Sequence, residues 1–433
     1  MTNTRKTTRR EWLALSGAVL LAPLAATSCT TKRQQGATYQ GTDEQLLDEI
    51  ERASFNFFWN EASPLTGQIK DRARLNGNDN RTMSSIASTG FGLTGLCTAD
   101  QRGYHVGSEI RERVRKTLRF IWNEMPHVHG FFYHFQDMNT GARWGKCELS
   151  SIDTSLLLCG VLTARQHFRD QEIKDLATKI YERVDWPWML NGGHTFFMGW
   201  HPETGFLKAR WEHYCELMMI YLLAIGSPTH PVSPDTWTAW SRPIIKFENL
   251  EYISGNDPIF THQYSQAWYD FRKKRDAYTD YYENSIKATK AHKLFCLRLH
   301  DRFSDYSEQL WGITSSDSAV GYQAWGGPPA LGKIDGSVVP CATGGSLVFL
   351  YDDCIEVLRN IRGSYGKQGA WGRYGLIDVF NPLTGWYNPD VIGIDVGITM
   401  LMAENKRTGF VWDTFMRNSE AQTAMKTVGL QSY

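Results

Sequence analysis

Residues 211–216 read WEHYCE, and they are followed directly by the apolar run 217–225 and by GSPTHP at 226–231. Glu212 and Glu216 are four residues apart, so on a helix their carboxylates would share one face. Trp211 and Tyr214 flank them. Carboxylates beside aromatic rings on the rim of a buried helix suit the cleavage of sugars, because a desolvated carboxyl can hold a proton near neutral pH. A helix that forms salt bridges at its exposed end is the alternative interpretation.

Helical periodicity recurs along the whole chain. Thr42 and Gln45 predict a capping box, and Ser108 is expected to cap the third helix. Helices are predicted over 42–59, 84–101, 108–122, 150–168, 171–184, 210–225, 278–302, 352–362, 394–405 and 409–415. The connections are rich in Gly, Trp and Tyr, and neither evenly spaced strands nor a βαβ alternation is indicated. We therefore predict an all-α fold, a single toroid of inner and outer helices with long loops over a central cleft.

The N-terminal residues resemble an export signal. Arg9 and Arg10 precede an apolar run that ends at Ala26, which is typical of a twin-arginine signal and too short for a permanent membrane span. We predict a signal over 1–28 with a possible lipobox at Cys29, although cleavage after Ser28 without lipid attachment is the alternative. Residues 29–41 are expected to be a polar tether, 42–420 the catalytic domain and 421–433 a C-terminal tail. The expected location is the periplasm or the outer membrane, with a lipid on Cys29 as the sole membrane contact.

The composition narrows the classes of function. Lys plus Arg and Asp plus Glu are both 46, so the balanced charge does not favour nucleic acid. The 16 Trp residues suggest a carbohydrate surface in an exported protein. Seven Cys residues remain beyond Cys29; without a CxxC spacing they predict buried free thiols. No Walker loop and no GxSxG elbow occurs, and no dinucleotide-binding loop is predicted, so no cofactor is expected.

Two further acidic segments are candidates for chemistry. Glu148 and Asp153 open an apolar helix at 148–154, where a capping role explains Glu148 more easily than Asp153. Asp395 precedes another apolar helix and is either a cap or a catalytic carboxylate. The segment 263–285 mixes amides, aromatics and charges, which suits hydroxyl-rich ligands or a polar layer that holds loops. His127, His129 and His134 lack acids at a recognised spacing, so we predict no metal site.

These motifs together resemble the bacterial glucoamylase-like proteins of glycoside hydrolase family 144 and its relatives, the β-1,2-glucanases. The resemblance runs from about Leu47 to Met416. It rests on the segments 66–67, 71–72, 87–93, 130–135, 148–154, 214–216, 227–231, 262–264, 268, 270–272, 280–281, 284–285, 311–314, 335–340, 378–381 and 394–397.

The resemblance implies an (α/α)6 toroid that hydrolyses β-1,2-linked glucan without a metal or an organic cofactor. The family's Tyr-Asn-Glu and Ile-Asp-Gln-Gly motifs, whose acids face the cleft, correspond to segments with Glu216 and Asp395. Here Cys215 replaces the usual Asn and Val396 the usual Gln, so hydrogen bonds from those amides are lost.

We predict an inverting glycoside hydrolase in which Glu216 is the general acid and Asp395 the general base. Asp153, the third predicted catalytic residue, and Glu148 would hold sugar hydroxyls or relay a proton. The other predicted substrate contacts are Trp211, Tyr214, His134, Gln263, Trp268, Arg272, Tyr322 and Trp386. A monomer acting on an oligo- or polysaccharide is expected. A same-fold glycosidase for another glucan linkage and a non-catalytic glycan-binding lipoprotein are the alternatives.

Overall fold

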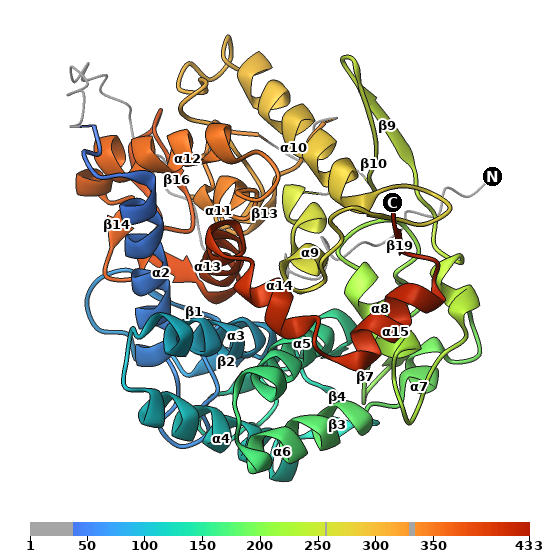
Figure 1. Ribbon diagram of the computed structural model, residues 1–433. Helices are drawn as coiled ribbons and strands as arrows, with labels where there is room; N and C mark the ends of the chain where they lie inside the picture. Colours follow the sequence, from blue (N-terminus) through green and yellow to red (C-terminus); the bar gives the residue numbers. More distant parts are fainter. Residues whose placement is uncertain (1–37, 256–257, 329–333) are drawn as a thin grey trace.

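The computed structural model describes residues 38–255, 258–328 and 334–433. Figure 1 shows its helices arranged as a ring. Their bounds are α2 (Asp43–Asn60), α3 (Ile86–Arg102), α4 (Gly107–Asn123), α5 (Ser151–His167), α6 (Gln171–Glu182), α7 (Trp186–Leu190), α8 (Met218–Ile225), α9 (Tyr264–Trp268), α10 (Tyr281–Arg298), α11 (Pro340–Gly344), α12 (Tyr351–Asn360), α13 (Gly393–Arg407), α14 (Phe410–Phe415) and α15 (Ser419–Thr427).

The helices fall into two classes by burial. Helices α3, α5, α8, α9, α11 and α13 are buried on nearly every side. Helices α2, α4, α6, α10 and α12 bury one face and leave the other in solvent. A helix that is apolar all round lies inside a protein, whereas an amphipathic helix lies at its surface. The first class therefore forms an inner ring and the second an outer ring, as predicted.

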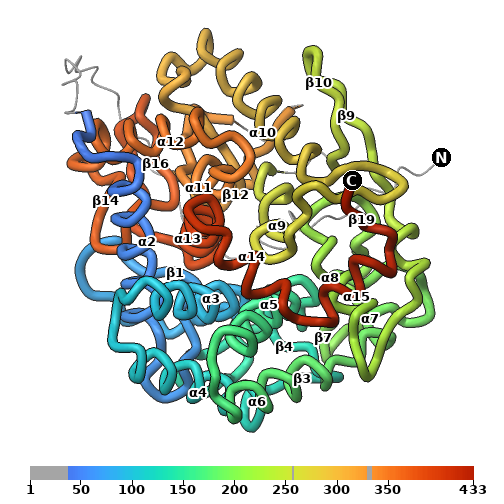
Figure 2. Tube along the Cα trace, viewed as in Figure 1, coloured from blue at the N-terminus to red at the C-terminus, as the bar shows by residue number. Residues whose placement is uncertain are grey.

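Close packing between inner helices, and between the first and last helices, holds the ring together. Helices α3 and α5 cross at Gly90 and Gly160, where an added Cβ on either glycine would collide with the facing backbone. Helix α13 packs against both α2 and α3. Figure 2 shows this closure, with the blue N-terminal helix beside the red C-terminal one.

Short strand pairs occupy the connections between helices. The antiparallel pairs are β1 (Arg72–Arg74) with β18 (Asp390–Ile392), β2 (Met83–Ser85) with β5 (Phe135–Asp137), β3 (His127–Val128) with β4 (Phe131–Phe132), β9 (Ile244–Phe247) with β10 (Leu250–Ile253), β11 (Lys274–Arg275) with β19 (Gln431–Ser432), β12 (Ser315–Ser316) with β13 (Gln323–Ala324), β14 (Trp371–Gly372) with β15 (Gly375–Leu376), and β16 (Phe380–Asn381) with β17 (Trp386–Tyr387). A three-stranded sheet joins β6 (Leu149–Ser150), β7 (Gly199–His201) and β8 (Gly205–Phe206).

Of the two helix caps predicted from side chains, one is present and one is not. Thr42 and Gln45 form the expected capping box, and Ser150 caps α5 through the Asp153 amide. The prediction for Ser108 is wrong, because α4 begins at Gly107 and its N-cap, Val106, makes no side-chain cap. The helix ends themselves lie within a few residues of the predicted bounds for most elements.

The helix predicted over 210–225 is wrong in its first half, because α8 begins only at Met218. The preceding segment is held instead by cross-chain backbone bonds. The Trp211 amide donates to the Phe196 carbonyl at 2.8 Å, and the Tyr214 amide to the Ser241 carbonyl at 2.8 Å. The two glutamates therefore share no helical face, and Glu212 is exposed.

The end of the chain and the cysteines also have defined places. Residues 421–433, expected as a tail, include most of α15, which packs on α8, and β19, which pairs with β11. The seven cysteines beyond Cys29 are free thiols, and all except Cys147 are buried, as predicted. The predicted signal and Cys29 lie outside the described residues, as does most of the tether.

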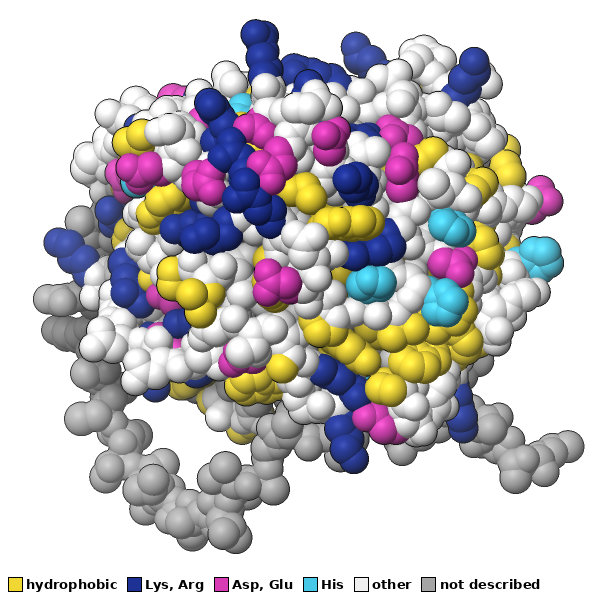
Figure 3. All heavy atoms as spheres, turned by 90° about the horizontal axis from the view of Figure 1, so that it is seen from below, with side chains coloured by type: hydrophobic (Ala, Val, Ile, Leu, Met, Phe, Trp, Pro, Cys, Tyr) yellow, Lys and Arg dark blue, Asp and Glu magenta, His cyan; other side chains and the backbone are white. Residues whose placement is uncertain are grey.

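One face of the molecule carries charges of both signs (Figure 3). Figure 3 shows one face on which acidic and basic side chains are interspersed and a hydrophobic patch lies beside histidines. Within the described residues, every helix is too short or too polar to cross a membrane.

Candidate active site

The segments that lead into three inner helices meet at one end of the ring. The Gly393 amide at the start of α13 donates to the Asp71 carbonyl at 2.7 Å, and the Ile86 amide of α3 donates to the His134 carbonyl at 3.2 Å. The His134 amide donates in turn to the Glu148 carbonyl, just before α5, at 3.0 Å. The N-terminal ends of α3, α5 and α13 therefore share one end of the toroid, where their partial positive charges favour carboxylates.

His134 joins two of the predicted acids. Its Nδ1 lies 3.0 Å from Glu148 Oε1 and its Nε2 lies 3.5 Å from Asp153 Oδ2. The ring stacks on Phe135 at 3.8 Å, and Ser150 Oγ donates to Asp153 Oδ2 at 2.5 Å. The structure thus brings His134, Glu148 and Asp153 together at one place.

The same three side chains are the group whose donor atoms could hold a cation. One ligand atom from each lies within 4.8 Å of the others. A histidine and two carboxylates suit a divalent transition metal, but hydrogen bonding between the ring and the acids accounts for the same approach. That the reaction needs no metal stays a prediction.

Glu216 is buried at the entrance to α8, with 2% of its surface exposed. The Ser265 hydroxyl bridges two backbone groups of this segment: Oγ donates to the Glu216 carbonyl at 2.7 Å and accepts from the Met219 amide at 3.1 Å. Upstream, Trp211 Nε1 donates to Ser151 Oγ at 2.8 Å, which ties this segment to the first turn of α5. Glu216 is therefore connected to the end of the ring that carries Asp153.

Asp395 lies in the first turn of α13 and is 7% exposed. Burial raises the pKa of Asp395 to about 7; hydrogen bonds from Asp378 and Cys341 and the charge of Arg72 lower it, while Asp317 raises it. Burial, followed by the charges of Asp395 and Asp317, raises the pKa of Asp378 well above its usual range. A carboxyl that titrates near neutral pH is suited to acid–base catalysis.

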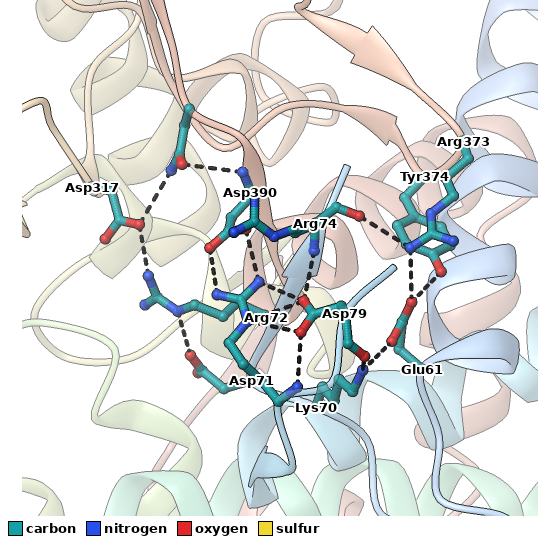
Figure 4. Close-up of polar contacts among 12 residues, drawn as sticks. Glu61, Lys70, Asp71, Arg72, Arg74, Asp79, Asp317, Arg373, Tyr374 and Asp390 are labelled. Carbon is teal, nitrogen blue, oxygen red and sulfur yellow. Dashed lines mark hydrogen bonds and ion pairs between the residues drawn. The ribbon is translucent and has the colours of Figure 1, made fainter. Parts of the chain in front are cut away.

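Ion pairs extend from this centre toward the loops. Figure 4 shows Arg72 between Asp71 and Asp317, at 2.9 and 2.6 Å. Arg81 lies between Asp79 and Asp390, at 2.5 and 2.6 Å. Because these residues come from β1, β18 and the connections beside them, the network fixes the loops around α13.

Tyr322 and Trp386 lie on hairpins at this end of the ring. Tyr322 follows β12 and is 36% exposed, and the pair between Arg72 and Asp317 anchors its hairpin to β1. Trp386 lies on β17 and is half-buried. Both rings keep accessible surface, as a substrate contact requires.

Three predicted substrate contacts have side chains with little or no exposed surface. Tyr214 and Trp268 have no exposed surface. Tyr214 stacks on Tyr281 and its hydroxyl hydrogen-bonds His262 at 3.2 Å, while Trp268 Nε1 donates to Thr94 Oγ1 at 2.9 Å. Trp211 keeps 3% of its surface, so it supports the segment before Glu216.

Two polar predictions are also corrected. Gln263 is buried, and its amide donates to the Ala342 carbonyl at 3.0 Å and to Ser346 Oγ at 2.8 Å, so it braces α11. Arg272 pairs with Asp270 at 2.9 Å and lies over the Trp412 ring at 4.1 Å. Trp412 follows the C-terminal end of α13, so Arg272 is at the opposite end of the ring from Asp395.

Three residues in or beside the site were given no role from the sequence. Asp378 and Cys341 line one small cavity with Asp395, and Trp144 is 42% exposed, its amide donating to the Phe135 carbonyl at 2.9 Å beside His134. The signal that could have found Asp378 is its place in the family segment 378–381. Trp144 is an exposed tryptophan in a loop four residues before Glu148.

The sequence of the chain is similar to those of known proteins. Residues 208–419 match the family described as "Glycoamylase: Putative glucoamylase". The exo-β-1,2-glucooligosaccharide sophorohydrolase (non-reducing end) of Parabacteroides distasonis is 29% identical over 430 residues, which covers 90% of this chain and 58% of that protein. The chain thus spans less than two thirds of that curated relative's length.

Solved structures resemble the chain along most of its length. An endo-β-1,2-glucanase from Chitinophaga pinensis, solved with sophorotriose and glucose, has a TM-score of 0.85 and 25% identity, covering 90% of this chain and 99% of that one. A β-1,2-glucanase from Parabacteroides distasonis has a TM-score of 0.84 and 26% identity, covering 90% and 60%. The prediction of a glucoamylase-like (α/α)6 toroid is confirmed. These similarities agree with the resemblance of its motifs to the bacterial glucoamylase-like proteins.

Proposed function

We propose that this protein is a glycoside hydrolase that cleaves β-1,2-linked glucan. The observation that carries the proposal is the placement of buried acids at the N-terminal ends of inner helices, with Asp395 in the first turn of α13 and Glu216 just before α8. A solved endo-β-1,2-glucanase that shares the overall fold and a relative named for β-1,2-glucooligosaccharide hydrolysis support the same substrate class.

We further propose an inverting mechanism. Glu216 protonates the leaving oxygen, and Asp395 takes a proton from water on the opposite face of the sugar. Burial raises the pKa of Asp395 to about 7. At neutral pH a large fraction of this carboxyl is therefore ionised, and the carboxylate is more basic than an ordinary aspartate. Both properties suit a general base. The side chains of His134, Glu148 and Asp153 hold sugar hydroxyls beside the two catalytic acids.

Digestion of linear β-1,2-glucan tests the substrate and the mode of cutting together. Products resolved by chain length distinguish internal cleavage from release of sophorose at one end, and NMR of the fresh products reports the anomer. We expect the α anomer first, since inversion of a β linkage gives it. A parallel panel of α-1,4-, β-1,3- and β-1,4-glucans covers the other linkages. Binding without new reducing ends would contradict the enzymatic proposal and favour a glycan-binding lipoprotein.

We also propose that the mature protein is an exported monomer with a lipid on Cys29. The basic residues Arg9 and Arg10, the apolar run and the Ser28-Cys29 pair support this, and the several acyl chains of a bacterial lipoprotein bind membranes firmly. Fractionation of cells that express the wild type or Cys29→Ala tests the anchor. Equal amounts of both proteins in the soluble periplasmic fraction would contradict it, and light scattering of the mature domain measures the oligomeric state.

A further inference from the structure

Asp378 and Asp395 form a buried pair of acids. Asp378 is 1% exposed and Asp395 is 7% exposed. Both line the same small cavity, whose other walls include the apolar side chains of Ile377, Ile392 and Val396. Two ionised carboxylates in such surroundings would repel each other with little solvent screening, so the pair must keep a proton near neutral pH.

The hydrogen bonds locate that proton. Asp378 Oδ2 accepts from Asn388 Nδ2 at 2.7 Å and from the Asp317 backbone amide at 3.1 Å. Within residues 38–255, 258–328 and 334–433, no N–H or hydroxyl donor pairs with Asp378 Oδ1 or Asp395 Oδ2, and both atoms are buried. Since Asp378 Oδ2 already faces two donors, a proton on Asp378 belongs on Oδ1. There it satisfies both orphaned oxygens at once.

We propose that Asp378 is a positioning residue for Asp395: its neutral carboxyl donates a hydrogen bond from Oδ1 to Asp395 Oδ2 and holds the Asp395 carboxylate ready to act as the base. This inference deepens the proposed function and rests on it for the role of Asp395. Asp378 itself touches neither sugar nor water in this scheme.

The other charges around the pair are consistent with this arrangement. Asp317, from the β12–β13 hairpin, disfavours a second negative charge on the pair. Arg72, from β1, favours one, although Asp71 and Asp317 already engage its guanidinium. Cys341, from α11, adds a thiol donor to Asp395. One negative charge, placed on Asp395, is therefore the state that these neighbours support.

Two substitutions test the proposal through activity on β-1,2-glucan. Asp378→Asn should keep kcat at pH 7 within about fivefold of wild type, because an amide can accept on the Asn388 side and donate on the Asp395 side. Asp378→Ala removes the donor, so kcat at pH 7 should fall about 10- to 100-fold. Its acid limb should move to higher pH, because Asp395 loses a hydrogen bond to its charged form. The proposal would be overturned if Asp378→Asn lost kcat severely and Asp378→Ala lost no more than that. Such a result is expected if Asp378 acts as an ionised carboxylate.

A stability measurement separates this inference from the proposed function. The unfolded Asp378 ionises near its ordinary pKa of about 4, whereas the native residue keeps its proton. Wild-type stability should therefore fall relative to Asp378→Asn as pH rises from about 5 to 8, by up to about tenfold in the folding equilibrium constant per pH unit. A stability difference that does not change with pH would overturn the proposal. A wild type without glucanase activity but with this pH dependence would refute the proposed function alone.

Discussion

Helix α13 carries one member of a buried acid pair at each end. At its start Asp395 lies beside Asp378, and near its end Glu404 lies beside Glu51, each of the latter two having no exposed surface. Burial, with a contribution from Glu404, raises the pKa of Glu51 to about 8, and burial raises that of Asp395 to about 7. A raised pKa by itself therefore does not distinguish the two pairs.

The surroundings of the two pairs do distinguish them. Arg102 Nε lies 2.7 Å from Glu404 and 3.8 Å from Glu51, Arg407 pairs with Glu51, and the Tyr104 hydroxyl donates to Glu51 at 2.9 Å. These cations and donors join α2, α3 and α13 to one another. Within the described residues, neither Asp378 nor Asp395 has an ion pair, and hydrogen bonds alone hold them. Glu51 and Glu404 form a compensated pair, because cations contact both acids, and this pair stabilises the ring. In the described part of the chain, Asp378 and Asp395 have no such cation and remain free to exchange a proton. The pair of Asp378 and Asp395 is therefore the candidate for chemistry.

Replacing the carboxyl at each end of α13 is the strongest test of this difference. Asp395→Asn should lower kcat on β-1,2-glucan on the order of 10²- to 10⁴-fold, the usual contribution of a general base, with the melting temperature nearly unchanged. Glu404→Gln, the matched control on the same helix, should keep kcat and lower the melting temperature. Steady-state rates and thermal unfolding of both variants check this. An Asp395→Asn protein that unfolds at room temperature would support a capping role instead.

Glu216→Gln extends the comparison to the second proposed catalytic acid. We expect a loss of kcat on the order of 10²- to 10⁴-fold, because the amide cannot protonate the leaving oxygen, while circular dichroism stays unchanged. The two residues act on one reaction, so the double variant with Asp395→Asn should be about as slow as the slower single variant. A Glu216→Gln rate above about a tenth of wild type is too high for a general acid.

Removing a cation from the compensated pair should affect stability and not chemistry. Arg407 is nearly buried, and it pairs with both Glu44 and Glu51. Arg407→Ala should lower the free energy of unfolding by about 1–3 kcal/mol, because it removes the buried hydrogen bond from Arg407 to Glu51. Urea melts measure this loss, and rates below the melting transition should match wild type. An equal loss of kcat in fully folded Arg407→Ala would show that the two ends of α13 are not independent.

Raising the pH should increase the rate through Asp395 and lower the stability through Glu51. The rate should rise with pH as Asp395 ionises, with half of the increase near pH 7. Stability should decline over the same range, because Glu51 keeps a proton up to about pH 8 in the native state but loses it near pH 4 when unfolded. Glu51→Gln should remove up to about 1.4 kcal/mol of that decline per pH unit. A decline that persists unchanged in Glu51→Gln would assign it to other groups.

The smallest expected effect comes from replacing Trp144, and Arg272 at the opposite end of the ring serves as its control. Trp144 is exposed beside His134, so Trp144→Ala should raise KM several-fold through lost contact with a sugar face, by about 0.5–1.5 kcal/mol, and leave kcat unchanged. Arg272→Ala at the far end should change neither constant. Initial rates over a range of glucan concentrations measure both. Equal KM values for Trp144→Ala and wild type would remove Trp144 from the substrate-binding surface.

Much of the fold and part of the site follow from the sequence, because their signals are local. Thr42 with Gln45, and Ser150 with Asp153, mark helix starts within one turn. Continuous apolar runs mark the inner helices, and the motif that contains Asp395 marks the start of α13. The acids Glu148, Asp153 and Asp395 were found in this way because each lies at a helix entrance, where sequence alone shows a carboxylate next to an apolar run.

Tertiary structure decided what depends on distant segments. Residues 210–217 have the composition of a helix, yet backbone bonds to Phe196 and Ser241 hold them in an irregular path. Trp268 has the composition of a sugar platform, but packing against α3 encloses it. Asp378 meets Asp395 only because the connection before β16 crosses the start of α13. Periodicity and capping are properties of neighbouring residues, whereas burial and the pairing of acids depend on which loops meet once the ring has closed.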